Sequence, residues 1–112
     1  LIISLPVFAG SLTLSSNDIA QGEFMDKKQE FNGFGCSGED LSPHLKWSNA
    51  PKGTKSFAIT AYDPDAPTGS GWWHWQIINI PANVTESATN AGSAKEDLAP
   101  AGSTQIQNDY GV

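Results

Sequence analysis

The chain has 112 residues, which suits a single domain, and its 16% charged and 38% hydrophobic residues exclude a disordered polyampholyte and a coiled coil. The formal net charge is −6, with lysines but no arginine, so an extended nucleic-acid interface is also excluded. The single cysteine, Cys36, leaves no partner for an internal disulfide. No cysteine and histidine cluster has the spacing of a metal site, so no metal is expected.

The first nine residues, LIISLPVFA, are apolar and uncharged. This run is too short to span a membrane, and small residues follow at Ala9, Gly10 and Ser11, as at a signal-peptidase cleavage site. We therefore interpret residues 1–10 as a signal-peptide remnant and expect a periplasmic or secreted protein that begins near Ser11. The alternative is a hydrophobic first strand, because Pro6 is compatible with a strand at a sheet edge.

The next part of the chain predicts short strands separated by loops. Residues 11–35 mix short apolar pieces with turn formers. Residues 33–40 form a glycine-rich loop that lacks the sequence pattern of a phosphate-binding loop. Leu45 and Trp47 alternate with polar residues as on a strand, and residues 49–54 then predict a turn.

Two strong strands are predicted further along, at residues 56–62 and 72–80. Apolar residues of the first strand, Phe57 and Ile59 among them, share one face. Residues 63–71 connect the two strands in a loop that two prolines stiffen.

Residues 82–103 are small, polar and poorly periodic, which indicates a long loop or a helical excursion around residues 93–98. Turn formers therefore separate short strands about every ten residues, a pattern typical of a β-sandwich. We expect an all-β fold, an antiparallel β-sandwich, in one domain over residues 11–112.

This arrangement brings a carboxylate and an imidazole together. Asp63 ends the first strong strand and His74 begins the second, so the loop holds them at neighbouring strand ends. We interpret the pair as a preorganised polar site beside tryptophan rings. Strict alternation puts three side chains on the face of His74, namely Trp72, Gln76 and Ile78, and puts Trp73 and Trp75 on the other face.

Each of these residues also has a structural interpretation. Asp63 and Asp65 beside proline and glycine are ordinary turn residues, the histidine is a candidate structural residue, and the tryptophans are candidates for the core. The two aspartates do not fit an EF-hand loop. They are also too close in sequence to flank a sugar as a glycosidase pair.

Several segments occur together in the order of one known family. They are Ser42-Pro43-His44-Leu45-Lys46-Trp47, Gly53-Thr54-Lys55-Ser56-Phe57-Ala58, Asp63-Pro64-Asp65-Ala66-Pro67, and Gly71-Trp72-Trp73-His74-Trp75 with Asn79-Ile80-Pro81. From about Leu12 onward the chain resembles the phosphatidylethanolamine-binding proteins (the Raf kinase inhibitor protein family), most closely their bacterial YbhB/YbcL branch. The combination of DPDAP and WHW at this spacing is highly specific.

The resemblance implies a β-sandwich with a small pocket that binds phosphate-like or phospholipid head-group anions, with no cofactor and no enzymatic activity. Asp63 and His74 match pocket residues of the family, and Pro67 and Trp72 match positions at the rim. The resemblance also implies a possible protein partner, because family members are reported to modulate kinases and, in other branches, proteases.

The sequence departs from the family pattern in two places. A glycine- and proline-rich loop leading to His-Arg-Tyr does not occur in it, so we expect an N-terminal fragment of the domain, truncated at the C-terminus, with an incomplete pocket and unpaired sheet edges. Asp40 stands where many relatives have Asn. Because relatives often carry a cysteine in that loop, the resemblance also predicts a disulfide between the loop and Cys36.

Two further function classes compete with the anion-binding one. The first is a secreted carbohydrate-binding module that uses Trp72, Trp73 and Trp75 as a stacking platform. Strict alternation places at most two of these rings on one face, which weakens this alternative. The second is an inhibitor that acts through its surface, which is compatible with anion binding.

Overall fold

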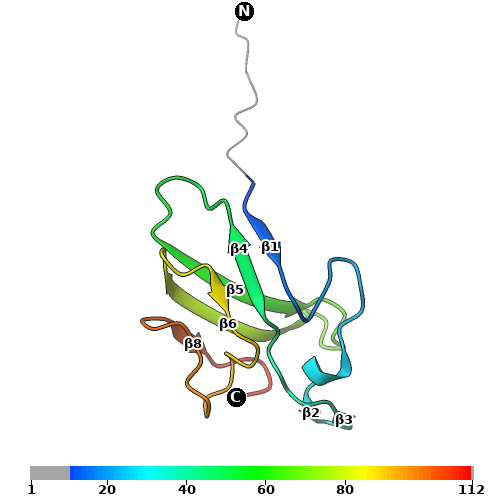
Figure 1. Ribbon diagram of the computed structural model, residues 1–112. Coiled ribbons are helices and arrows are strands. Elements are labelled where there is room, and N and C mark those ends of the chain that lie inside the picture. Colours follow the sequence, from blue (N-terminus) through cyan, green and yellow to red (C-terminus); the bar gives the residue numbers. More distant parts are fainter. Residues whose placement is uncertain (1–10, 112) are drawn as a thin grey trace, which may run out of the picture.

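The computed structural model describes residues 11–111, and the predicted signal-peptide remnant, residues 1–10, lies outside the described residues. The regular elements of the described chain are strands and one short 3-10 helix, which turns and loops connect (Figure 1). In chain order the elements are β1 (Thr13–Ser15), η1 (Lys27–Gln29), β2 (Asn32–Gly33), β3 (Cys36–Ser37), β4 (Leu45–Ser48), β5 (Ser56–Asp63), β6 (Trp72–Pro81), β7 (Glu86–Ser87) and β8 (Thr104–Ile106). Residues 93–98 form turns instead of a helical excursion. No helix within residues 11–111 is long and apolar enough to cross a membrane.

The strands form two three-stranded sheets and one small hairpin, and every strand pair is antiparallel. One sheet has the order β1-β4-β7 and the other has the order β5-β6-β8, while β2 and β3 form the hairpin. In Figure 1, β4 lies across the long ribbons of β5 and β6. The predicted all-β, antiparallel fold is therefore confirmed.

The hydrophobic core lies between the two sheets. Leu45 and Trp47 of β4 pack against Ile77 and Ile80 of β6, and all four side chains are buried. The Trp47 ring also contacts Phe57 of β5, with ring centroids 5.5 Å apart. Burying an aliphatic or aromatic side chain of this size contributes roughly 1.5–3 kcal/mol, so these contacts fix the β5–β6 hairpin against β4.

A β-bulge interrupts the alternation of β6 at His74. Ala61 of β5 pairs with Trp75, and the next residue, Tyr62, pairs with Trp73, so His74 is an extra residue on β6. Residues that pair directly share a face of the sheet. Trp75 therefore lies on the inward face with Ala61, while Trp73 lies on the outward face with Tyr62.

The bulge corrects the predicted faces of β6. Trp72 pairs with Asp63, an inward residue of β5, so Trp72 and Trp75 share a face, and the prediction that they lie on opposite faces was wrong. Gln76 and Ile78 were expected on the face of Trp72. They fall on the other face, because the bulge shifts the alternation by one residue.

Candidate functional site

Asp63 and His74 lie at neighbouring strand ends, as the sequence predicts. Nε2 of His74 is 3.4 Å from Oδ2 of Asp63, and the two side chains are 33% and 41% exposed, respectively. The bulge turns the imidazole toward the carboxylate, in the way that bulges commonly re-aim a side chain beside a site. Because Trp72 pairs with Asp63, the three side chains converge where the hairpin loop begins.

Internal hydrogen bonds hold the loop of residues 63–71. Oδ1 of Asp63 accepts a bond from the Asp65 N–H at 2.9 Å, which is the turn bond that its structural interpretation requires. The Thr68 hydroxyl donates to the Gly71 carbonyl at 2.9 Å. One carboxylate oxygen of Asp63 thus fixes the loop while the other faces His74.

A segment after β8 binds the outer edge of the bulge. Asn108 Nδ2 donates to the His74 carbonyl at 3.0 Å. Asp109 accepts the Trp73 N–H through Oδ2 at 2.7 Å and donates its own N–H to the Trp73 carbonyl at 3.0 Å. The Tyr110 N–H donates to Asn108 Oδ1 at 3.0 Å. These bonds place the Tyr110 ring 5.1 Å from the His74 ring.

Aromatic rings form a wall around Tyr110. Its ring meets Trp72 edge-on, with centroids 4.8 Å apart and planes at 86°. Phe31 stacks on it at 4.1 Å, and Phe34 lies 5.8 Å away. Edge-on and offset ring pairs are favourable arrangements, so the wall keeps the tyrosine in one orientation beside His74.

The surroundings of Tyr110 keep its hydroxyl protonated. Burial raises the pKa of this hydroxyl above its usual value of 10.0, and the nearby acidic groups of Cys36, Asp63 and Asp40 raise it further. At neutral pH the group is therefore a hydrogen-bond donor at the edge of the site.

A cleft of about 770 Å³ opens beside His74 and Tyr110. Lys95 brings a positive charge to its lining, whereas Glu39 and Asp40 bring negative charge. The lining of the cleft is therefore mixed in charge.

The structure brings together three of the four predicted binding residues. His74 lines the cleft, and the Asp63 carboxylate contacts the His74 ring. Trp72 packs against Tyr110, whereas Pro67 is exposed in the loop and is not part of the cleft lining. Sequence reasoning missed Tyr110, because only the tertiary fold brings it to His74. The binding roles of the four residues stay a prediction.

The tryptophans of β6 do not form one stacking platform. Trp72 and Trp75 face inward, whereas Trp73 is on the outward face, where it packs on Tyr62 at 4.7 Å with planes inclined by 41°. A stacking platform made of all three tryptophans would need their rings exposed on one face of the sheet. The arrangement therefore offers no support for the carbohydrate-binding alternative.

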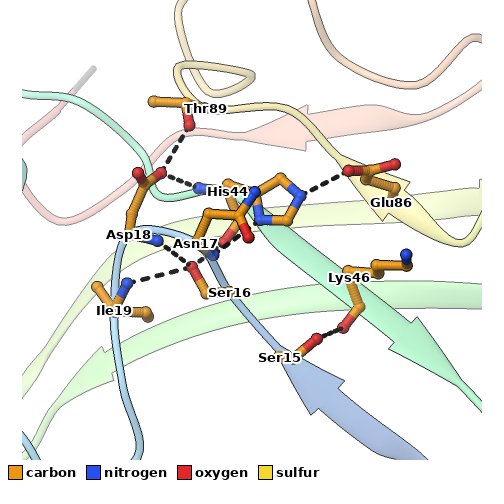
Figure 2. A network of polar contacts seen from close by, with 9 residues as sticks. All are labelled: Ser15, Ser16, Asn17, Asp18, Ile19, His44, Lys46, Glu86 and Thr89. Carbon is orange, nitrogen blue, oxygen red and sulfur yellow. Dashed lines mark hydrogen bonds and ion pairs between the residues drawn. The ribbon is translucent and has the colours of Figure 1, made fainter.

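A second polar cluster surrounds His44, which is buried (Figure 2). Its Nδ1 accepts the Asn17 N–H at 3.0 Å, so the ring proton is on Nε2, which donates to Oε1 of Glu86 at 2.6 Å. This bond lowers the pKa of the Glu86 carboxyl. Both ring nitrogens are engaged within the protein.

Asp18, which follows Asn17, links Thr89 to this cluster (Figure 2). Its Oδ2 accepts the Thr89 hydroxyl and the His44 N–H, each at 2.6 Å. The Thr89 bond, followed by the His44 bond, lowers the pKa of the Asp18 carboxyl. The cluster joins the segment after β1 to β4 and to the chain beyond β7, which indicates a structural role and not a binding one.

The acidic, histidine and cysteine side chains of the described residues outside these two clusters do not form a metal site. Among residues 11–111, no group of three or more His, Cys, Asp or Glu side chains is arranged to hold a metal ion. Cys36 is exposed and free within the described chain, and its predicted disulfide to a loop outside this sequence stays a prediction.

The family model described as phosphatidylethanolamine-binding protein matches residues 15–112. The chain belongs to this family. It is 50% identical over 109 residues to the UPF0098 protein YbcL of Escherichia coli K12, which covers 97% of this chain and 60% of YbcL. Identity to the UPF0098 protein YbhB of the same organism is 46% over 100 residues, covering 89% of this chain and 63% of YbhB.

Solved structures of phosphatidylethanolamine-binding proteins have the same fold. The crystal structure of Escherichia coli YbcL matches with a TM-score of 0.86 at 52% identity, over 89% of this chain and 61% of that one. A homologue from Chlamydia trachomatis, CT736, matches with a TM-score of 0.70 at 26% identity, over 91% and 61%. The chain thus spans about 60% of the length of these relatives.

Proposed function

We propose that this member of the phosphatidylethanolamine-binding protein family is a non-enzymatic binding protein that takes phosphate-like anions or phospholipid head groups in the cleft beside His74. The supporting observation is the imidazole itself. It is one-third exposed, lines the cleft, and lies between the Asp63 carboxylate and the Tyr110 ring. Family membership supports a binding function in general, and the ligand class is our inference from this geometry and from the family resemblance.

The charge balance requires that any anion be held by local donors. A net charge of −6 repels anions at a distance. Lys95 and the neutral Tyr110 hydroxyl are among the donors that line the cleft, as are serine and amide side chains such as Ser42 and Asn90. An imidazole of His74 that carries a proton on both ring nitrogens can donate to Asp63 and to a phosphate group at the same time.

Asp63 has a different part in this proposal, because a carboxylate is a poor receptor for an anion. It accepts the His74 ring proton and so orients the imidazole. In this proposal its negative charge, which lies next to the cleft through the contact with His74, also attracts the ammonium group of phosphoethanolamine. The ligand that fits both charges is therefore zwitterionic.

Isothermal titration of inorganic phosphate and of phosphoethanolamine into the purified protein tests this proposal. His74→Ala should weaken the binding of both ligands, and Asp63→Asn should weaken phosphoethanolamine more than phosphate. Gln76→Ala, on the other face of β6, is the matched control and should bind like the wild type. Equal binding by the wild type and His74→Ala would exclude His74 from the site.

A protein kinase or protease partner would extend this proposal. Only the family resemblance supports it, since no contact within residues 11–111 favours such a partner over a small ligand. Binding of the head group does not depend on it.

A further inference from the structure

The segment of residues 16–19, which follows β1, is fastened to β4 through His44. The His44 carbonyl accepts the Ser16 hydroxyl, and the His44 N–H donates to Oδ2 of Asp18 at 2.6 Å. The ring takes part as well, because its Nδ1 accepts the Asn17 N–H at 3.0 Å. Of these three bonds, only the one from Asn17 uses the ring and so depends on its protonation.

The other ring nitrogen of His44 binds Glu86 of β7 (Figure 2). Nε2 lies 2.6 Å from Oε1 of Glu86 and donates its proton to that carboxylate. The His44 side chain is 10% exposed, whereas that of Glu86 is 57% exposed. The neutral ring therefore has an acceptor nitrogen toward Asn17 and a donor nitrogen toward Glu86.

A second proton on the His44 ring changes the Asn17 side most. An imidazolium donates from both nitrogens and accepts at neither. Nδ1–H and the Asn17 N–H would then face each other as two donors, with their nitrogens 3.0 Å apart beside a largely buried ring. A buried donor that loses its acceptor is unfavourable. The bond to Glu86 is kept and becomes charge-assisted, which strengthens it.

Only contacts that differ between the fastened and the released segment decide the direction of the effect. β7 pairs with β4, so the contact of Glu86 with the ring persists when residues 16–19 move away. It therefore stabilises the imidazolium in both states. The Asn17 bond exists only in the fastened state and requires a neutral ring, so protonation favours release.

The other charged groups around the ring have smaller effects on this balance. The carboxylate of Asp18 lies on the segment itself and attracts an imidazolium, which opposes release. Its hydrogen bonds contribute more to the lowered pKa of this carboxyl than the attraction to the ring does. Lys28 of η1 interacts with the Asp18 carboxylate and Lys46 of β4 with that of Glu86, and both lysines repel a cationic ring. The direct opposition of two donors at Nδ1 therefore decides the outcome.

We propose that His44 is a pH-sensitive latch, whose protonation releases the segment of residues 16–19 from β4 while the ring stays bound to Glu86. Histidine is the side chain that ordinarily changes charge between pH 5 and 8. The segment is therefore fastened at pH 8 and opens more often at pH 5. Protonation removes one of the three bonds to His44, so it raises the frequency of local opening and does not unfold the chain.

Hydrogen exchange of the Asn17 amide, followed by NMR in the wild-type chain between pH 8 and pH 5, tests the latch. Each rate is divided by that of an unstructured amide at the same pH, which removes the intrinsic effect of pH. The protection of Asn17 should fall about tenfold, which is the factor that one hydrogen bond contributes. The Trp47 amide, which donates to the Thr85 carbonyl at 2.9 Å, is the control and should keep its protection. Unchanged protection of Asn17 at pH 5, or an equal loss at both amides, would overturn the proposal.

Two substitutions separate the ring from other acid-sensitive groups. Hydrogen bonds lower the pKa values of the Asp18 and Glu86 carboxyls, so both stay ionised at pH 5. His44→Asn puts an amide oxygen in place of Nδ1 and takes up no proton, so its Asn17 protection should not depend on pH. Glu86→Gln keeps an acceptor for Nε2 but removes the charge that stabilises the imidazolium, so the loss of protection should move to lower pH.

Circular dichroism shows whether each variant keeps the fold, and Glu86→Gln tests the latch even if His44→Asn does not fold. A folded His44→Asn variant that loses Asn17 protection as the wild type does would overturn the proposal. A transition in Glu86→Gln at the same pH as in the wild type would do so as well.

Discussion

Gly71 lies where the loop between β5 and β6 closes, and replacing it tests how that loop positions Asp63. Its φ of +72° is in the left-handed region, and a Cβ there would lie 2.6 Å from the Asp63 carbonyl oxygen and 2.4 Å from the Tyr62 hydroxyl oxygen. Gly69 has a φ of +81° but open space around it. The two glycines therefore separate backbone strain from steric overlap within one loop.

Gly69→Ala should cost about 1 kcal/mol, the difference between alanine and glycine in a left-handed conformation. Gly71→Ala adds overpacking against a backbone atom that cannot rotate away, which costs about 1–3 kcal/mol more. Its total should therefore be about 3 kcal/mol, and the displaced Asp63 carbonyl should also disturb the contact with His74.

Urea unfolding followed by tryptophan fluorescence measures both costs, since the denaturation midpoint falls with stability. We expect a modest shift for Gly69→Ala and a shift about three times as large for Gly71→Ala. Equal midpoints for the two variants would refute the idea that close backbone packing at Gly71 fixes the loop.

The tyrosinate absorbance of the wild-type protein should show a transition above pH 10 that is absent from Tyr110→Phe. The free energy of unfolding of the wild type should fall as the pH rises through that transition, because the folded state favours the neutral hydroxyl. A transition at or below pH 10 would contradict the buried placement. The lowered pKa of Asp18 means that its stabilising contribution is present above pH 4 and is lost as the pH falls through its folded pKa. The Asp18→Asn variant should therefore be less stable than the wild type at neutral pH, and its stability should depend less on acid pH. An acid unfolding profile identical to that of the wild type would count against the cluster. Sequencing the mature N-terminus after expression in a bacterial host should find a start near Ser11, whereas a product that retains Leu1–Ala9 would rule out export through this segment.

The two long strands could be predicted from sequence because their pattern is local. Phe57, Ile59 and Ala61 alternate with small or polar residues, and the structure confirms that they face inward. The tryptophan-rich strand was also found, and the proline-stiffened loop placed Asp63 near His74.

The faces of β6 could not be predicted, because a bulge leaves no clear mark in a run as uniform as WWHWQIINI. Only the pairing of Ala61 with Trp75 and of Tyr62 with Trp73 shows that His74 is the extra residue. Strict alternation of side chains along β6 therefore predicts the wrong faces for its tryptophans.

Contacts between distant segments were also outside the reach of sequence patterns. Tyr110 reaches His74 through bonds from Asn108 across a separation of 34 residues. The bonds of His44 to Glu86 and Asn17 span 42 and 27 residues. The strands β7 and β8 are so short that tertiary pairing, and not their own propensity, defines them.

A phosphorylated head group bound in the cleft beside His74 should perturb the nuclei of the residues that line it. Chemical-shift mapping of the isotope-labelled wild-type protein during titration with phosphoethanolamine measures this. We predict saturable shifts at His74, Tyr110 and Lys95 with a common dissociation constant, and none at His44 or Glu86. Saturable shifts confined to residues outside the cleft, or no shifts at all, would contradict the account.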